Sequence, residues 1–480
     1  MLETFISIAF WLSSLITLVI LVLLPTPYHP DPASRDESQS SPKNPNAKAK
    51  VTTQILVLGD IGRSPRMQYH ALSIARHGGD VDIIGYHESE PHPEIMSNPR
   101  ISIVPLPSHP AFLQTSNKLL FLFYAPLKIL LQVVYLWNIL AYRTKPARWL
   151  LVQNPPSIPT LAIASLVCFL RHTNLIIDWH NFGYSILALK LGSNHPLVKL
   201  SHWYERFFCR FAMVHLCVTV AMASVLKTKF PIKAPILPLH DRPASHLQPI
   251  LDHQKRRDFI LSLPESEDVR SSIVDGNIRT IVSSTSWTPD EDFSLLIDAL
   301  CRYSELATTS KPYLPKILAI ITGKGPQKEM YLRRISECKK AGKLGKVTIR
   351  SAWLSPYDYA TLLASATLGV SLHTSSSGVD LPMKVVDMFG AGLPVIGWNR
   401  FESWPELVTE GVNGRGFGSS EELVDCLVDL LGDSAQLEKL RAGAYQESSR
   451  RWDDEWDPVA GHLLGFINIG STNKVKKQTT

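Results

Sequence analysis

A chain of 480 residues with 45% hydrophobic and 19% charged side chains is long enough for more than one core and too apolar to be disordered. Its 49 basic and 43 acidic residues give a formal charge of +6 without the clustered basic stripe of a nucleic-acid binder, so we expect no nucleic acid among its partners. The six cysteines are widely spaced and form no Cys-x-x-Cys pair, which excludes a zinc ribbon or a redox couple of that type and indicates reduced thiols.

The first expected element is a membrane helix. Residues 5–24 carry no charge, and 20 residues match a hydrocarbon core of about 30 Å. The basic residues that follow are Arg35, Lys43, Lys48 and Lys50, so the rest of the chain is expected on the cytosolic side. We therefore assign residues 1–24 to a lumenal tip and transmembrane anchor. A cleaved signal peptide is the alternative, although its apolar core is normally shorter.

Residues 25–50 are rich in Pro, Ser and charge, which predicts a flexible linker. The folded body begins near Val51. Residues 54–86 contain an apolar strand, a Gly-bearing turn, an amphipathic helix and a second strand, which is the pattern of a βαβ unit. Further strands are expected at 101–106, 149–154 and 174–180. Residues 51–235 are therefore predicted to form a Rossmann-like, doubly wound parallel sheet.

One apolar stretch inside this domain has three interpretations. Residues 119–142 contain a single charge, Lys128, and are long enough to span a membrane. We favour an interfacial or re-entrant helix, because a second crossing would place the two halves of the body on opposite sides of the membrane. An ordinary buried helix is the remaining alternative.

The second half repeats the alternation of strands and helices. Residues 236–270 are rich in Pro and charge and are interpreted as a linker. Residues 271–445 form the second Rossmann-like domain, and residues 446–480 are expected to form a returning helix and a disordered tail. Its strands are expected at 280–285, 317–323, 346–352, 368–373 and 393–398. Ligands of such sheets bind beyond the carboxyl ends of the strands, which predicts a cleft between the two domains.

Polar residues in the first half lie at these strand ends. The turn after the first strand contains Gly62, Arg63 and Arg66 at the start of a helix, where backbone N–H groups and guanidinium groups could hold a phosphate. An ordinary strand-to-helix turn has the same spacing. Asp178 and His180 close a fully apolar strand and are candidates for proton transfer or sugar contact, with a structural histidine as the alternative.

The second half offers a similar set. Lys324 stands between Gly323 and Gly325 after a strand, where a lysine could neutralise a diphosphate leaving group; a solvated turn lysine is the alternative. A polar loop containing Gly378 opens a helix that carries Lys384 and Asp387 on one face, either as ligand-binding groups or as a surface ion pair.

Two Asp-x-Asp strings invite a metal assignment. We decline both, because Asp80 and Asp82 begin a predicted strand, and Asp290 and Asp292 lie in the acidic first turn of a predicted helix.

Together, several long segments are similar to the eukaryotic chitobiosyldiphosphodolichol β-mannosyltransferase family. The segments are residues 59–78, 153–160, 177–186, 194–208, 283–296, 321–326 and 373–395. The resemblance implies the GT-B fold. It also implies an inverting transfer of mannose from GDP-mannose to dolichyl-diphosphate-linked chitobiose at the cytosolic face of the endoplasmic reticulum membrane, with no cofactor required. A divalent cation is not indicated. Other mannosyltransferases of the dolichol pathway are expected partners.

The resemblance also implies roles for individual residues. It places Lys324 and Lys384 among the donor-binding residues, and His180 at the donor sugar. Ser284 is a further donor-binding candidate. Asp387 matches the second acid of the Glu-x7-Glu pattern of related enzymes. Val379 occupies the position of the first acid, so the neighbouring Asp380 is the candidate substitute. Asp60, facing the acceptor, is the expected general base, with Asp178 next.

Two other functions remain open. A transferase of the same fold with a different donor or acceptor fits the same spacing, because spacing does not identify a base or a sugar. A membrane-tethered scaffold without catalysis is the alternative from a different class. The turn of the first half and the filled Lys and acid positions of the second half argue against that scaffold.

Overall fold

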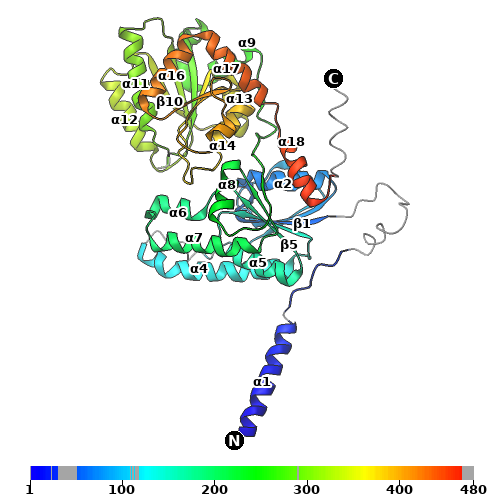
Figure 1. Ribbon diagram of the computed structural model, residues 1–480. Helices are drawn as coiled ribbons and strands as arrows, with labels where there is room; N and C mark the ends of the chain where they lie inside the picture. Colours follow the sequence, from blue (N-terminus) through cyan, green and yellow to red (C-terminus); the bar gives the residue numbers. More distant parts are fainter. Residues whose placement is uncertain are drawn as a thin grey trace, which may run out of the picture.

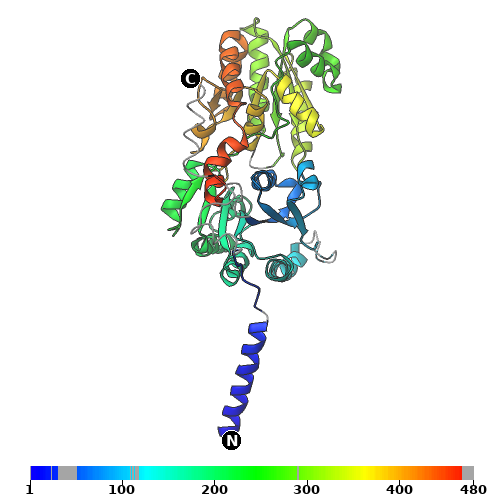
Figure 2. The ribbon, with the colours of Figure 1, turned by 90° about the vertical axis from the view of Figure 1, so that its right-hand side faces the viewer.

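The computed structural model describes residues 2–22, 24–30, 51–108, 110, 113, 118–288 and 291–467. These residues form two α/β domains, one above the other in Figure 1, and each domain is built on its own parallel sheet. The prediction of two Rossmann-like sheets is confirmed. Helix α1 (Leu2–Val22) projects away from both domains in Figures 1 and 2.

The first sheet has seven parallel strands in the order β3-β2-β1-β4-β5-β6-β7. The central strand β1 buries residues 53–58 without interruption, as expected of a parallel strand with helices on both faces. Its Ile55 lies opposite Ile83 of β2 and Leu151 of β4. The strands are β1 (Thr52–Asp60), β2 (Asp80–Tyr86), β3 (Ile101–Pro105), β4 (Trp149–Asn154), β5 (Asn174–Trp179), β6 (Val214–Cys217) and β7 (Ile236–Pro238).

The second sheet has six parallel strands in the order β10-β9-β8-β11-β12-β13. Ile281 of β8 lies opposite Ala319 of β9 and Leu368 of β11. The strands are β8 (Ile278–Ser284), β9 (Lys316–Thr322), β10 (Val347–Ala352), β11 (Leu368–Ser371), β12 (Val395–Trp398) and β13 (Gly414–Phe417).

Helices flank both sheets. Those of the first domain are α2 (Pro65–Arg76), α3 (Pro93–Ser97), α4 (Lys118–Asn138), α5 (Thr160–Arg171), α6 (Gly183–Leu191), α7 (Pro196–Phe208) and α8 (Val220–Lys229). Those that follow are α9 (His253–Ser262), α10 (Arg270–Val274), α11 (Ser294–Thr309), α12 (Lys328–Lys340), α13 (Pro356–Ser365), α14 (Met383–Gly390), α15 (Trp404–Leu407), α16 (Ser420–Gly432), α17 (Ser434–Glu447), α18 (Trp452–Trp456) and α19 (His462–Leu464).

The expected linker 236–270 is more ordered than its composition suggests. Strand β7 at its start extends the first sheet to Pro238, three residues beyond the expected domain boundary, and α9 and a 3-10 helix (Pro264–Val269) follow. A three-residue edge strand containing Pro has no periodicity to reveal it.

The chain returns to the first domain at its C-terminal end, as α18 packs against α2 (Figure 1). The indole Nε1 of the fully buried Trp456 donates to Nδ1 of His70 at 2.9 Å, and that of Trp452 donates to the Ser73 hydroxyl at 3.1 Å. Residues 468–480, where a tail was expected, lie outside the described residues.

One helix in the described part of the chain, Tyr124–Arg143, is long and apolar enough to cross a membrane by length and composition. It comprises most of α4 and the π-helical turn after it. The start of the body is also tied to this region, because Thr26 and Tyr28, which follow α1, hydrogen-bond Arg171 at the end of α5.

Candidate active site at the facing edges of the two sheets

The predicted residues collect where the two sheets face each other. Asp60 ends β1, Asp178 lies near the end of β5, Ser284 ends β8 and Lys324 follows β9. The two edges meet directly, since the Asn181 amide beyond β5 donates to the Asp380 carboxylate at 3.1 Å and to the Ser376 hydroxyl at 3.0 Å. The carboxyl ends of both sheets therefore contribute to one region of the molecule.

A buried charge network supports the first-domain side. Arg66 binds Asp178 with two nitrogens, at 2.7 and 2.9 Å, and uses the third for Asp241 at 2.8 Å and the Leu239 carbonyl at 2.9 Å. Arg66 is 4% exposed and Asp178 is fully buried. The prediction that Arg66 offers its guanidinium to a phosphate is therefore wrong, because all three nitrogens already have partners.

Asp178 organises two histidines as well. Its Oδ2 lies 3.0 Å from Nε2 of His180 and 3.3 Å from Nε2 of His70. Because Trp456 can only donate to Nδ1 of His70, the neutral His70 ring carries its proton on Nε2 and donates it to Asp178. Burial raises the pKa of Asp178, but Arg66 and His180 outweigh that effect and hold it well below its ordinary value.

His180 is the part of this network that reaches the surface. Its side chain is 24% exposed, whereas Asp178 has no exposed surface. The contact with Asp178 occupies Nε2 and fixes the orientation of the ring, as a carboxylate does for a catalytic or sugar-binding histidine.

The two oxygens of Asp60 have different surroundings. Oδ1 accepts the backbone N–H groups of Gly62 at 3.3 Å, Glu88 at 3.2 Å and Ser89 at 3.1 Å. Oδ2 is buried and accepts no hydrogen bond, and its nearest cation is Nε of the exposed Arg63 at 3.4 Å. Burial raises the pKa of Asp60, but hydrogen bonding to Ser89 and to the amides of Glu88 and Gly62 outweighs it, so the pKa is lowered.

Gly62 is required by its neighbours. A Cβ atom there would lie 2.5 Å from the Ser89 carbonyl oxygen, so only glycine lets the turn after β1 approach the loop after β2. The sequence predicted that the backbone at Gly62 would approach a ligand closely; in the structure it approaches the backbone of Ser89 and Glu90. The same approach brings the Ser89 amide to Asp60.

On the second-domain side, Lys384 is held by a residue that the sequence did not single out. Its Nζ forms an ion pair with Oε1 of Glu291. Glu291 is 2% exposed, and its Oε2 accepts the Thr285 hydroxyl at 2.6 Å and the Ser286 amide at 2.7 Å. Lys384 is therefore not in the surface pair with Asp387 that was the alternative, and Glu291 ties α14 to the loop after β8.

The turn after β9 depends on close packing against the loop after β8. Gly323 has φ +138°, and a Cβ atom there would lie 1.7 Å from the Thr285 carbonyl oxygen. Lys324 is exposed and its Nζ lies 3.9 Å above the ring of Trp353. Ser284, next to this turn, hydrogen-bonds the Tyr359 hydroxyl at 2.9 Å and the Thr322 hydroxyl at 3.3 Å.

Asp380 holds the polar loop after β11 in shape. Its carboxylate accepts from Ser375, from Nε2 of His373 at 3.2 Å and from Asn181 of the first domain. Burial raises the pKa of Asp380, but the hydrogen bond from His373 outweighs it, so the pKa is lowered. Gly378, with φ +77°, turns this loop. Asp380 is therefore a bridge between the domains as well as the candidate acid.

Asp387 is the acid with the most perturbed environment on this side. Burial raises its pKa to about 7. Burial and then the charges of Asp387 and Asp241 raise the pKa of Tyr69 in α2 to about 12. A carboxyl group with a pKa near 7 is common at functional sites.

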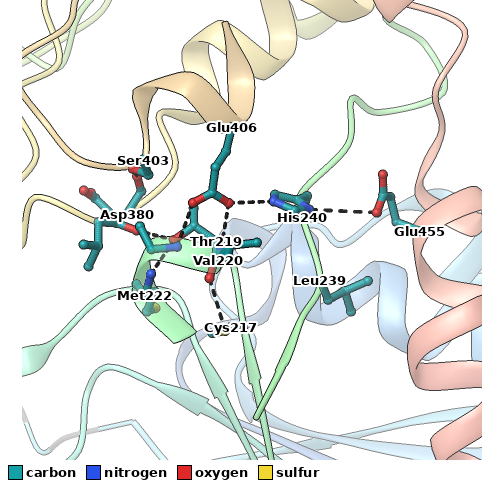
Figure 3. Close-up of polar contacts among 12 residues, drawn as sticks. Cys217, Thr219, Val220, Met222, Leu239, His240, Asp380, Ser403, Glu406 and Glu455 are labelled. Carbon is teal, nitrogen blue, oxygen red and sulfur yellow. Dashed lines mark hydrogen bonds and ion pairs between the residues drawn. The ribbon is translucent and has the colours of Figure 1, made fainter. Parts of the chain in front are cut away.

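A polar latch joins the domains beside this region (Figure 3). The carboxylate of Glu406, in α15, accepts the first two N–H groups of α8, from Val220 at 2.6 Å and Ala221 at 2.7 Å, and lies 2.8 Å from Nε2 of His240. Burial raises the pKa of Glu406, but the hydrogen bonds from His240 and these amides outweigh it, so the pKa is lowered. The negative side chain also matches the positive end of the helix dipole.

Two hydroxyl groups extend the latch to the predicted donor loop. Thr219, which caps α8, donates to the Val379 carbonyl at 2.6 Å, and Ser403 donates to the Asp380 carbonyl at 2.6 Å. The backbone of residues 379 and 380 is thus fixed from both domains. Among the described residues, no group of three or more His, Cys, Asp or Glu side chains is placed to hold a metal ion; Asp290 lies outside them.

Comparisons with known proteins agree with this architecture. Residues 279–433 match the family model of glycosyl transferases group 1. A chitobiosyldiphosphodolichol beta-mannosyltransferase of Arthroderma benhamiae is 53% identical over 94% of this chain and 96% of its own length. The UDP-glycosyltransferase TURAN of Arabidopsis thaliana is 40% identical over 85% of this chain and 96% of its own length.

The fold is also that of a solved structure. Sucrose-phosphate synthase from Thermosynechococcus elongatus superposes with a TM-score of 0.59 at 12% identity, covering 89% of this chain and 99% of that one. Since identity above 30% extends over nearly the whole chain, the resemblance expected from the sequence is confirmed. The chain belongs to the chitobiosyldiphosphodolichol beta-mannosyltransferase family of group 1 glycosyltransferases.

Proposed function

We propose that the protein transfers mannose from GDP-mannose to the chitobiose of a dolichyl-diphosphate-linked acceptor, forming a β-1,4 linkage. The observation that carries the proposal is the 53% identity, over 94% of the chain, to the chitobiosyldiphosphodolichol beta-mannosyltransferase of Arthroderma benhamiae. The facing sheet edges support it, because a two-domain transferase holds donor and acceptor between its halves.

An inverting transfer needs a general base on the acceptor side. We assign that role to Asp60, because Oδ1 is committed to three amides while Oδ2 accepts no hydrogen bond and can take the proton of the acceptor hydroxyl when the exposed Arg63 side chain moves away from it. Its lowered pKa keeps it ionised at neutral pH. The bond from the acceptor oxygen to the sugar forms as the bond to the diphosphate breaks, with inversion at the sugar carbon.

Asp178 is better suited to positioning than to proton transfer. It has no exposed surface and is engaged by Arg66, His70 and His180. We infer that it orients His180, which contacts the sugar of the donor. The proposed role of His180 rests on its partial exposure beside the loop that carries Asp380.

The donor diphosphate is assigned to the second domain. Lys384 is fixed by Glu291 at the start of α14, where helix N–H groups and a cation act on the same negative charge. Gly323, Lys324, Ser284 and Gly378 border the same region. Lys324 would exchange its contact with the Trp353 ring for a phosphate oxygen.

The proposed location is the endoplasmic reticulum membrane, with residues 5–24 as the single anchor and the body in the cytosol. The name of the relatives supports a dolichol-linked acceptor, and the basic residues after the apolar run support the orientation. An N-terminal tag that is detected only after the lumen is opened would agree with this topology.

One assay tests the donor and the acceptor together. The purified full-length protein is given a dolichol-linked chitobiose acceptor with either GDP-mannose or a UDP-sugar. We expect transfer from GDP-mannose alone. The UDP-sugar is the second candidate because the plant relative is named a UDP-glycosyltransferase. Transfer from that donor only, or from neither, would overturn the proposal.

A further inference from the structure

The helices next to α1 expose an unusual amount of apolar surface. Helices α4, α5, α6 and α7 pack against one another in the first domain; α4, α5 and α7 lie on the side of this domain nearest α1 in Figure 1, and α6 lies above α7. We call this the α4–α7 face. Its large exposed side chains include Leu130 (58%), Phe169 (77%), Leu189 (57%), Leu200 (50%) and Trp203 (57%). Patches of this extent on a soluble surface usually mark a binding surface.

The part of the chain that contains these helices is strongly basic, although the net charge of the whole chain is only +6. Residues 106–240 contain 13 Lys and Arg residues but only two acids, Asp178 and Glu205, and both are fully buried. The rest of the chain has 36 basic and 41 acidic residues and is therefore net negative. The basic residues are Lys118, Lys128, Arg143, Lys145, Arg148, Arg171, Lys190, Lys199, Arg206, Arg210, Lys227, Lys229 and Lys233.

Aromatic and basic side chains alternate along α7 and the turn after it. Trp203 stacks on Phe207, and the Arg210 guanidinium lies 4.9 Å from the Phe207 ring. Aromatic rings with flanking Lys and Arg are typical of surfaces that lie at a membrane interface.

The position of α1 indicates what covers this face. The amide of Tyr28 donates to the Arg171 carbonyl at 2.7 Å, and Nε of Arg171 donates to the Thr26 carbonyl at 3.1 Å. Residues just after the proposed anchor are thus fixed to the last residue of α5, within the α4–α7 face. A helix inserted in a bilayer would hold this face against the surface of that bilayer.

We propose that the α4–α7 face docks on a bilayer that contains anionic lipids, with its apolar side chains in the interface and its basic residues on the headgroups. The docking rests on the proposed membrane anchor but not on the sugar that is transferred. It gives the enzyme a second membrane contact, whose strength depends on the negative charge of the lipids. This contact orients the body over its lipid-linked acceptor.

The test separates the two membrane contacts within the full-length protein. A specific protease site is inserted after residue 40, and the chain is reconstituted into vesicles of phosphatidylcholine alone or with 30% phosphatidylserine. Flotation before cleavage measures the anchor, and flotation of the body after cleavage measures docking. We expect the cleaved body to stay on the anionic vesicles and to be released from them by 0.5 M salt.

Matched variants assign the contact to this face. The pair Lys199→Gln and Arg210→Gln should lower retention on anionic vesicles at least about tenfold, since each basic residue near such a surface contributes roughly 1 kcal/mol. Phe169→Ser with Trp203→Ser should release the body as well. Tyr313→Ser with Tyr357→Ser, which changes exposed aromatic residues of the second domain, is the control and should change nothing.

Three outcomes would overturn the proposal. These are release of the wild-type body from both kinds of vesicle, equal retention on neutral vesicles, and retention only when other membrane proteins are present, which would mean a protein partner. Flotation of the uncleaved chain and its sugar transfer are measured in the same samples, so failure of docking is distinguished from failure of the anchor or of the proposed reaction.

Discussion

Single residues in this site differ in ways that their sequence positions do not reveal. Asp60, Asp178 and Asp387 are all candidate site residues, yet Asp60 has an oxygen without a hydrogen bond, Asp178 has a partner on each oxygen, and Asp387 has a raised pKa. The difference arises from neighbours that are distant in sequence. Each environment therefore predicts a different response to the same Asp→Asn change.

For Asp60→Asn we expect kcat to fall by about 10² to 10⁴, the usual contribution of a general base. The asparagine keeps one oxygen for the three backbone amides, so the loop should hold its shape, and GDP affinity should change by less than about twofold. Steady-state kinetics and GDP titration check the two halves of this expectation. A loss of only a few-fold would assign the base elsewhere.

Asp387 should make donor binding depend on pH. Its raised pKa of about 7 means that the ionised form, which accepts ribose hydroxyl groups best, gains population as pH rises through 7. GDP affinity should therefore be several-fold higher at pH 8 than at pH 6, measured by calorimetry. The Asp387→Asn variant should bind GDP more weakly than the wild type, with an affinity that does not change between pH 6 and pH 8. The exposed Asp425→Asn should keep the wild-type pH dependence. A wild-type GDP affinity that is independent of pH would contradict a role of Asp387 in donor binding.

At the scale of elements, the turns after β8 and β9 form one unit. They approach so closely that Gly323→Ala would force a Cβ atom against the Thr285 carbonyl, at a φ of +138° that alanine rarely adopts. We expect a loss of roughly 2–4 kcal/mol of stability and weakened GDP binding, from thermal unfolding and titration. Gly345→Ala, which has open space around it, is the matched control. Equal behaviour of the two variants would show that the turns can move apart.

The elements that the sequence predicted are those with long apolar runs. Strands β1, β5 and β9 bury continuous segments, and the turns that follow them end in polar groups, so both the sheets and the strand-end residues were predictable. Strands β6, β7 and β13 were not predicted, because His215 interrupts the apolar residues of β6, β7 has three residues that include Pro238, and β13 alternates Gly with Arg and Phe.

The site residues that the sequence analysis did not identify were overlooked for a common reason. Glu291, Asn181 and Glu406 act through partners that are 93, 199 and 166 or more residues away. No local pattern encodes such a pairing. Asn181 and Glu406 find their partners on the other domain and Glu291 on a distant helix of its own domain, so only the folded structure reveals them, as it does the bond from Trp456 to His70.

For the whole molecule, the latch at Glu406 predicts a response to acid. Its pKa is lowered in the folded protein, so the ionised side chain stabilises the interface fully above about pH 4.5, and that contribution is lost as pH falls further through the lowered pKa. The domain arrangement should therefore be unchanged between pH 6 and 8 and should open in acid. Interdomain energy transfer between two dyes measures this.

The neutral variant Glu406→Gln should reproduce the acid effect at pH 7. An amide cannot match the charge at the start of α8, so the spacing between the dyes should increase. The exposed Glu402→Gln lies in the same segment and should leave the spacing unchanged. If Glu406→Gln also leaves it unchanged, other contacts hold the domains together.

The contact between α18 and α2 has a consequence for how this protein is made. The strands of both sheets and the core helices α16 and α17 are complete when the ribosome has passed Glu447, yet the indole that holds His70 against Asp178 is contributed by Trp456. A nascent chain can therefore fold both halves before the support beneath His180 exists. A stop codon in this short interval would yield a molecule with every strand in place and an unfinished catalytic centre.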